Sequence, residues 1–469
     1  MSGRGAEAES FERAGFHPAL LGRAYDVIKR FADEGKIPGG VAQVGTSEHL
    51  LPPFAYGDAS WEPVRRPARA DTIYDCASLT KVVVTTTLAL GLVEQGKICL
   101  DDRVAEWIPE FLELAPDDPG FGDAAGQAAP GELAADSGSG NAGVETHSDN
   151  GSGSAGVDTN SDNGSGNAAV VNGRGDAAVD NGPGNPASGN PASGNRAGPS
   201  GRSERSVRRG VTVRHLLTHT SGLAAWAPLY QRGRGPTEIL EALCREPLAR
   251  EPGTGVIYSC LGFILLGTLI EREEGTTLDR LAEERIFGPL GMKDSGFNLP
   301  PSLFERIAPT EKVGERVIHG VVHDENARGR GGVSGNAGLF STAPDLSRFA
   351  QAILRLRRGK PAAFAPPGAF LSPVAVQAST RNYTEGMGEP RGLGWLLRSQ
   401  TMNPCGDLFG AESFGHTGFT GTSLWIDPGL DLFVVLLTNR VHPTRENTAH
   451  LRLRPLFHNA VAAARALGG

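Results

Sequence analysis

A long low-complexity stretch interrupts this 469-residue chain and constrains how its two flanking parts can fold. From residue 119 to residue 210, Gly, Ser, Asn, Ala and Pro dominate, and the hexamer Ser-Asp-Asn-Gly-Ser-Gly occurs at 148–153 and again at 161–166. Such a stretch has too few large apolar side chains to offset the entropy lost on ordering. We therefore predict a disordered insertion over 119–210 and a single folded domain built from residues 1–118 and 211–469.

Composition and charge exclude several classes of protein. The formal net charge of −8 argues against a dedicated nucleic-acid binder, and no apolar run approaches the ~20 residues that span a bilayer. The N-terminal residues lack the apolar core of a secretory signal, so we expect a cytoplasmic protein unless the true start lies further upstream. The arginines at the end of the insertion (Arg202, Arg205, Arg208 and Arg209) are interpreted as a solvated linker end rather than a nucleic-acid or membrane contact.

Metal and disulfide chemistry are not expected either. The five cysteines are scattered without a CxxC pair, so neither a disulfide framework nor a zinc knuckle is predicted. Two histidine pairs, His215/His219 and His319/His323, have i, i+4 spacing, but no third ligand is evident beside either pair. We therefore predict no metal and no cofactor.

Apolar periodicity outside the insertion predicts a mixture of helices and strands. Helical spacing marks residues 20–31, 78–95, 260–274, 278–287, 344–357 and 446–467. Strands are predicted at 41–44, 418–426 and 432–438, the last two joined by a turn at 427–429. Because strands lie towards both ends and helices between them, we predict an α+β fold with a sheet built from both termini and a helical half in the middle.

The segment Ser78-Leu79-Thr80-Lys81 is the first candidate for chemistry, and it is the only SxxK sequence in the chain. Positions i and i+3 share one face of a helix, so the Ser78 hydroxyl and the Lys81 amine can meet. A serine in the first helical turn also lies in a field that favours an oxyanion. A buried, neutral Lys81 would then act as base towards Ser78. The alternative is a capping serine followed by an exposed lysine.

Two further segments carry candidate residues. Tyr258 precedes the apolar helix predicted from Cys260, where a hydroxyl at a helix start can serve as a proton shuttle. The segment 415–422 contains three glycines beside His416, so a ligand can approach the strand edge and its backbone N–H groups can form an oxyanion hole. The alternatives are a tyrosine packed under a loop and a glycine-rich bend with a surface histidine.

In this order, the three segments resemble the penicillin-recognising serine hydrolases, the superfamily of class C β-lactamases, DD-peptidases, D-aminopeptidases and related esterases. The stretches 213–223, 289–295 and 392–395 are similar to other recurrent parts of that superfamily. The resemblance covers nearly the whole chain outside the insertion. It implies an antiparallel sheet flanked by helices, beside an all-helical half, with the site between the two.

The resemblance also implies a role for each matching residue. Ser78 would be the acylated nucleophile, Lys81 its general base and Tyr258 the proton relay to the leaving group. The third motif would contribute His416 to catalysis and Thr417 and Gly418 to substrate binding, with Cys260 beside them. The backbone N–H groups of Ser78 and Phe419 would form the oxyanion hole.

Two departures from the superfamily pattern bear on the substrate. Position 260 is Cys where the superfamily commonly has Asn, which removes a carboxamide that would contact a substrate amide. His416 stands where lysine is usual, and a histidine is expected to titrate near neutrality and to attract a substrate carboxylate more weakly. Both departures favour a peptidase, amidase or esterase over an efficient β-lactamase.

Three functions remain open from the sequence. The first is a serine hydrolase acting through an acyl-enzyme on a small ester, a peptide, a peptidoglycan fragment or a β-lactam. The second is a catalytically impaired binding or sensor module of the same fold. In the third, the insertion itself recruits partners. The sequence does not decide the oligomeric state.

Overall fold

The computed structural model describes residues 9–116, 203–400 and 403–465, all of which belong to one compact unit. Residues 119–202 of the predicted insertion lie outside the described ranges, and so does the second unit, 138–199. Within the described ranges, no helix combines the length and the apolar character needed to cross a bilayer.

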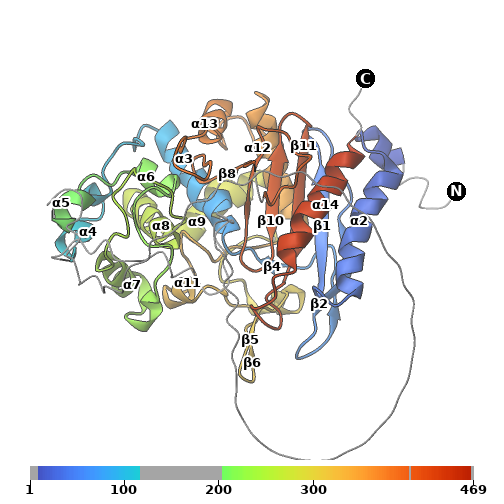
Figure 1. The fold of residues 1–469 in the computed structure, drawn as a ribbon, viewed down its shortest axis with the longest axis horizontal. Helices are drawn as coiled ribbons and strands as arrows, with labels where there is room; N and C mark the ends of the chain where they lie inside the picture. The colour runs from blue at the N-terminus through green and yellow to red at the C-terminus, as the bar shows by residue number, and fades with distance from the viewer. Residues whose placement is uncertain (1–8, 117–202, 401–402, 466–469) are drawn as a thin grey trace, which may run out of the picture. The chain divides into compact units, whose positions relative to one another are not determined.

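A seven-stranded antiparallel sheet is built from both ends of the chain (Figure 1). In spatial order its strands are β3 (Arg66–Pro67), β2 (Phe54–Ser60), β1 (Gly39–Gly45), β11 (Leu432–Thr438), β10 (Ser423–Asp427), β9 (Phe414–Thr417) and β8 (Leu396–Leu397). The N-terminal strand β1 pairs directly with the C-terminal strand β11, and Gly40 lies opposite Thr438. The prediction of a sheet formed by both termini is therefore confirmed.

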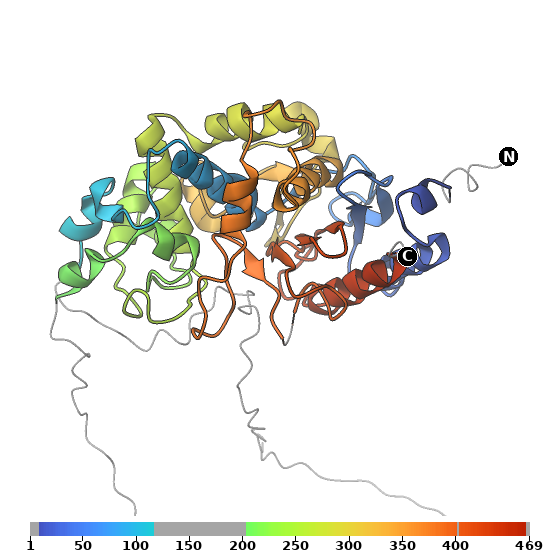
Figure 2. The same cartoon turned by 90° about the horizontal axis from the view of Figure 1, so that it is seen from above.

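Helices cover both faces of this sheet. On one face, α2 (Pro18–Asp33) and α14 (His450–Ala464) pack side by side, as Figures 1 and 2 both show. On the other face lies α12 (Ala343–Arg357). Alternate side chains of β11 enter the two cores, since Val434 belongs to the core under α2 and α14 and Val435 to the core under α12.

The helical half follows the first strands in the chain. It contains α4 (Glu110–Glu113), α5 (Glu204–Arg208), α6 (Val213–Leu217), α7 (Gly235–Cys244), α8 (Cys260–Glu274), α9 (Leu278–Ala282), α10 (Gly288–Leu290) and α11 (Glu325–Gly329). Every residue of α8 from Cys260 to Ile270 is buried, as expected for a helix enclosed by its neighbours. Two small antiparallel pairs, β4 (Tyr74–Asp75) with β7 (Phe340–Ser341) and β5 (Lys312–Val313) with β6 (Arg316–Val317), and the helix α13 (Pro373–Ser379) complete the architecture.

Several predicted elements match closely, and others differ for a local reason. The helix predicted at 78–95 contains a π-helical segment, Lys81–Thr86, before α3 (Thr87–Glu94). The helix predicted at 278–287 is likewise α9 followed by a π-helical segment, Glu283–Phe287. The strand predicted at 418–426 is wrong in its first half, because the Gly418 N–H donates to Thr422 O at 2.8 Å and closes a turn before β10.

The predicted end of the insertion also needs correction. Residues 203–210 were assigned to the insertion, yet they include the helix α5, which belongs to the folded unit. The Arg208 side chain is fully buried, pairs with Glu204 at 2.9 Å and donates to the Phe111 carbonyl oxygen at 3.1 Å. Arg208 is therefore an internal anchor of the helical half and not part of a solvated linker.

Candidate active site

The turn that carries Ser78 is held by a buried carboxylate. Strand β4 ends at Asp75, whose Oδ1 accepts the Ala77 N–H at 2.8 Å and whose Oδ2 accepts the His323 N–H at 2.7 Å. Ala77 has a φ of +46°, a left-handed conformation that costs energy for a residue with a side chain. Burial raises the pKa of Asp75 to about 6. This strained turn sets the position of Ser78 at the start of the helical segment.

Lys81 lies against Ser78 in the interior of the protein. Its Nζ is 2.8 Å from Ser78 Oγ, 3.3 Å from Asn336 O and 3.4 Å from Cys260 Sγ. The Lys81 side chain has no exposed surface, and Ser78 is 5% exposed. The sequence expectation of a buried lysine beside the serine agrees with this geometry. Asn336, which the sequence analysis did not single out, supplies the backbone contact.

Tyr258 stands over the same lysine. Lys81 Nζ is 4.9 Å from the centroid of the Tyr258 ring, and the His219 ring packs against the Tyr258 ring at 4.6 Å. Nδ1 of His219 accepts the Ser259 N–H at 3.0 Å, and Ser259 caps the N-terminus of α8. His219, which the sequence indicated only as half of a possible metal pair, therefore contacts both Tyr258 and the residue that follows it.

A buried arginine also faces Tyr258. The Arg391 guanidinium carbon is 5.1 Å from the Tyr258 ring centroid, and the side chain is 2% exposed and paired with Glu389. Arg391 could not be recognised from the three motifs, because it lies on a loop far from each of them in the sequence. Its place directly before the Gly-Leu-Gly-Trp stretch at 392–395 was the available signal.

His416 is held neutral by its surroundings. It lies in β9, is 3% exposed, and its Nδ1 lies 2.8 Å from Thr417 O. Burial lowers the pKa of His416 well below the usual range, and the nearby positive charge of Arg391 lowers it further. The expectation that His416 titrates near neutrality is therefore wrong. The His416 ring is 5.8 Å from that of Tyr258.

The turn after β9 is tied to the turn that carries Ser78. Thr420 Oγ1 donates to Asp75 O at 2.7 Å, and Thr422 Oγ1 donates to Cys76 O at 3.1 Å. A Cβ atom on Gly418 would overlap Cys76 O, so only glycine permits this close approach. The positions of the Ser78 and Phe419 backbone groups are thus fixed relative to each other by direct hydrogen bonds between the two turns.

A small pocket opens beside these two turns. Its lining comprises Ala77, Ser78, Trp226, Cys260, His323, Asp324, Glu325, Ala337, Phe419 and Arg445. The pocket therefore joins the candidate nucleophile, Cys260 and Phe419. Tyr258, His416 and Thr417 are not among the residues that line it.

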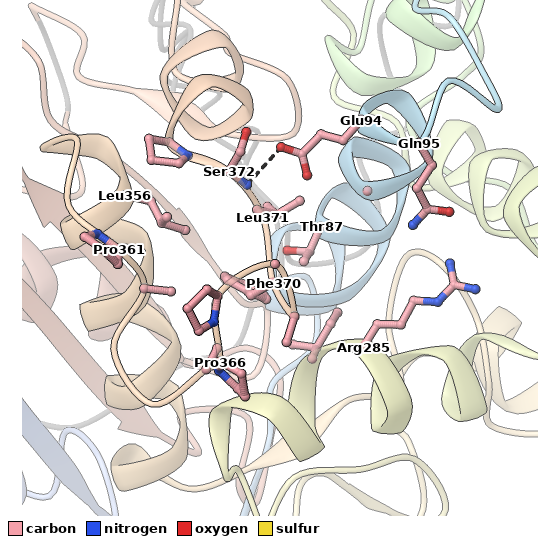
Figure 3. Close-up of a pocket in the computed structure, with 18 of the residues that line it drawn as sticks. Thr87, Glu94, Gln95, Arg285, Leu356, Pro361, Pro366, Phe370, Leu371 and Ser372 are labelled. Atoms are coloured by element: carbon pink, nitrogen blue, oxygen red, sulfur yellow. Dashed lines mark hydrogen bonds between the residues drawn. The ribbon is translucent and has the colours of Figure 1, made fainter.

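A second, larger pocket lies between α3 and the loop that leads into α13 (Figure 3). Glu94 Oε1 accepts the Ser372 N–H there at 2.8 Å, and Arg285 extends from the opposite side. Neither Ser78 nor Lys81 lines this pocket, so it is not the candidate active site.

The two histidine pairs have local structural roles. His215 Nδ1 accepts the Thr212 N–H at 3.1 Å within the cap of α6. His319 Nε2 lies 2.9 Å from Phe304 O, and the His323 ring stacks on Phe419. In the part of the chain that the structure describes, no group of three or more His, Cys, Asp or Glu side chains is arranged to hold a metal ion.

Comparisons with known proteins identify a family and several relatives for this chain. The family model described as Beta-lactamase matches residues 25–128 and 199–458. A putative D-alanyl-D-alanine carboxypeptidase from Escherichia coli (strain K12) is 35% identical over 260 residues, which cover 49% of this chain and 57% of the relative. Its counterpart from Salmonella typhi is 33% identical over 257 residues, with 48% and 56% covered. The chain thus spans little more than half the length of these curated relatives.

Solved structures share the fold at low sequence identity. EstCE1, described as a hydrolase with promiscuous acyltransferase activity, has a TM-score of 0.62 at 20% identity, covering 94% of this chain and 98% of that one. A class C β-lactamase has a TM-score of 0.60 at 17% identity, with 96% and 97% covered. The architecture predicted from the sequence, a sheet flanked by helices beside a helical half, is confirmed by these neighbours.

Proposed function

Because this chain belongs to the Beta-lactamase family of serine hydrolases, we propose that Ser78 is the nucleophile of an acyl-transfer reaction on an ester or amide. One observation carries the proposal: a fully buried lysine amine lies 2.8 Å from the Ser78 hydroxyl. Nucleophile and base must be within hydrogen-bond reach for the base to accept the proton during attack.

Lys81 is the general base in this proposal. A charge removed from water is costly, so complete burial favours the neutral amine. The two N–H groups of a neutral amine can donate to Asn336 O and Cys260 Sγ, which leaves its lone pair towards the Ser78 O–H. Lys81 then takes the hydroxyl proton as Ser78 Oγ bonds to the carbonyl carbon of the substrate.

The tetrahedral oxyanion that forms needs donors that are already in place. The Ser78 N–H lies at the start of a helical segment, and the neighbouring N–H groups of Ala77 and Leu79 already donate to Asp75 Oδ1 and Cys76 O. We assign the Ser78 and Phe419 N–H groups as the two donors, because both residues line the same pocket.

Tyr258 completes the proposed reaction. The centroid of its ring lies 4.9 Å from Lys81 Nζ, so the side chain is beside the base, and we assign its hydroxyl the transfer of the proton to the leaving amine or alcohol. The acyl group remains on Ser78 until water attacks it, with the proton movements reversed. The products are a carboxylic acid and the free amine or alcohol.

The site favours esters and peptides over β-lactams. Cys260, at the position where the superfamily commonly has Asn, presents a thiol and not a carboxamide to the pocket. His416 carries no charge, so the third motif lacks a cation for a substrate carboxylate, whether of a β-lactam or of a peptide C-terminus, and this favours the ester. The sequence relatives are described as putative D-alanyl-D-alanine carboxypeptidases, and we propose a D-amino-acid peptide or small ester as substrate.

The test is intact-protein mass spectrometry after incubation with p-nitrophenyl acetate, a D-alanyl-D-alanine peptide and benzylpenicillin. We expect a Ser78 adduct with the ester and continued product release, and neither in Ser78→Ala. An adduct without turnover would support the alternative of a binding or sensor module. Folded protein that gives neither an adduct nor a product with any of the three compounds would contradict the proposal.

A further inference from the structure

We propose that Arg454 is a positioning residue for this reaction, because its guanidinium holds and polarises the peptide group that supplies one donor of the oxyanion hole. The inference rests on the proposed function, since it requires the Phe419 N–H to receive the oxyanion. Arg454 lies on α14, does not line the Ser78 pocket, and is 5% exposed.

One guanidinium nitrogen closes the turn. Arg454 Nη2 donates to Gly418 O at 2.8 Å and to Thr422 O at 2.8 Å. The turn is also closed from within, because the Gly418 N–H donates to Thr422 O. Arg454 therefore fixes both ends of the turn that presents Phe419. It does so from α14, a helix that begins at His450, well after this turn in the sequence.

The first of these carbonyls belongs to the critical peptide group. Gly418 O and the Phe419 N–H are the two ends of one planar, conjugated unit. A hydrogen bond from a charged donor is stronger than one from a neutral donor, and it draws electron density towards the carbonyl oxygen. The N–H at the other end of the unit becomes a stronger donor as a result, and a buried site increases the effect.

A stronger Phe419 N–H donor stabilises the transition state more than it stabilises the bound substrate. A hydrogen bond to an oxyanion gains more from a stronger donor than one to a neutral carbonyl oxygen does. Loss of the Arg454 contact should therefore lower kcat and leave KM nearly unchanged. Removing a complete oxyanion donor costs about 100- to 1,000-fold in rate, and weakening one should cost about tenfold.

A second arginine at the same turn has a different effect. Arg440 Nε donates to Phe419 O at 2.7 Å, and its guanidinium carbon lies 4.3 Å from the centroid of the Phe419 ring. Phe419 O belongs to the following peptide group, which carries the Thr420 N–H. Arg440 thus anchors the residue, whereas Arg454 acts on the peptide group that donates.

The kinetic test compares Arg454→Met, Arg454→Lys and a control, Arg348→Met, on the full chain with p-nitrophenyl acetate. Arg348 also donates to a backbone carbonyl, Leu290 O, from a different helix, α12. We expect kcat about tenfold lower in Arg454→Met with an unchanged KM, a partial recovery in Arg454→Lys because the charge is kept, and wild-type values in Arg348→Met. An unchanged kcat in folded Arg454→Met overturns the inference.

A spectroscopic readout separates polarisation from loss of structure. Isotope-edited infrared difference spectra report the carbonyl stretch of the acyl group on Ser78, which moves to lower wavenumber as the oxyanion donors become stronger. We expect this band at higher wavenumber in Arg454→Met than in wild type. A fallen kcat with an unshifted band would show a merely structural role. If Arg454→Met does not fold, Arg454→Gln keeps a donor without charge and must show the same shift.

Failure of the proposed function has a different signature. If wild-type protein forms no acyl-enzyme and hydrolyses no ester, the assignment of Ser78 fails, and the inference on Arg454 falls with it. If wild type is acylated and the band is the same in wild type and in the uncharged variants Arg454→Met and Arg454→Gln, only the inference is wrong.

Discussion

The protonation state of single side chains in this site depends on how completely they are buried. Lys81 is fully buried among Ser78, Cys260 and Asn336, which makes an otherwise ordinary lysine suitable as a base. His416 is buried as well, and burial lowers its pKa so that it stays neutral at physiological pH. The same physical cost of a buried charge therefore explains both the proposed base and the uncharged third motif.

Substitution of the proposed base by arginine gives a sharp prediction at this scale. Lys81→Arg places a permanent cation beside Ser78 that cannot accept a proton, because arginine stays protonated in proteins. We expect kcat/KM for p-nitrophenyl acetate to fall by about 100- to 10,000-fold, the range typical for loss of a general base. The measurement is steady-state hydrolysis, with the exposed Lys293→Arg as a matched control that should retain wild-type activity.

Wild-type rates in folded Lys81→Arg would contradict the assignment of Lys81 as base. Circular dichroism distinguishes that result from misfolding. The arginine is larger than the lysine it replaces in a closed site, so a loss of folded signal would call for Lys81→Met, where the same fall in rate is expected.

At the scale of elements, the π-helical segment Lys81–Thr86 is a feature that periodicity did not predict. Thr87 Oγ1 donates to Val82 O at 3.0 Å, five residues earlier, and Thr85 Oγ1 donates to Gly335 O at 2.7 Å. The apolar spacing of 78–95 matches a helix of 3.6 residues per turn, and the wider turn depends on contacts with residues near 335. Such segments often occur at functional sites, and this one begins at Lys81.

The helix α14 gives a prediction about stability and pH. His458 is fully buried, its Nδ1 lies 2.8 Å from Pro404 O, and burial lowers the pKa of His458 to about 4. The unfolded chain binds a proton on this residue below about pH 6.5, whereas the folded protein does not until about pH 4. The free energy of unfolding therefore decreases as the pH falls from 6.5 towards 4.

His458→Asn removes this titration and keeps a polar group near Pro404. We expect the stability advantage of wild type over His458→Asn to shrink by about 2 kcal/mol between pH 7 and pH 5, at 1.36 kcal/mol per pH unit below 6.5. Urea denaturation at the two pH values measures it. An advantage that is independent of pH would show that His458 titrates normally in the folded protein.

At the scale of the whole molecule, the described fold joins segments that the insertion separates by almost a hundred residues. The helices α4 and α5 lie on either side of it in the chain, and Arg208 of α5 donates to Phe111 O of α4. Arg208 also donates to Cys244 O at 2.6 Å, so α7 is attached to the same guanidinium. The boundary of the folded domain therefore lies before α5.

Two deletions test this boundary. Replacing residues 119–202 by a short Gly/Ser linker should leave ester hydrolysis and the melting temperature close to wild type, because a long loop adds only slowly to the cost of closure. Replacing 119–210 also removes the buried Arg208–Glu204 pair and its three backbone contacts, including Glu246 O. We expect the second deletion to lower the melting temperature clearly in a thermal unfolding measurement.

Equal melting temperatures for the two deletions would contradict the importance of α5. If hydrolysis disappears in the shorter deletion as well, the insertion contributes to the reaction. If hydrolysis is retained while a biological effect of the protein is lost, the insertion acts by recruiting partners.

The sequence by itself determined whatever short-range spacing can encode. Apolar periodicity placed α8, α12 and β11 almost to the residue, and the i, i+3 spacing put the Ser78 and Lys81 side chains on one face. The order of the three motifs along the chain was enough to recognise the family. These features depend on neighbours within a few residues, so they can be seen without coordinates.

Only the tertiary structure decided the environment of those residues. The charge state of His416, the ring of His219 beneath Tyr258 and the contact of Arg454 with Gly418 O all depend on groups from distant parts of the chain. Burial is a property of the assembled core, and electrostatic effects follow from distances in space rather than positions in sequence. A motif thus identifies the reacting groups, while the packing around them determines their protonation states and their orientation.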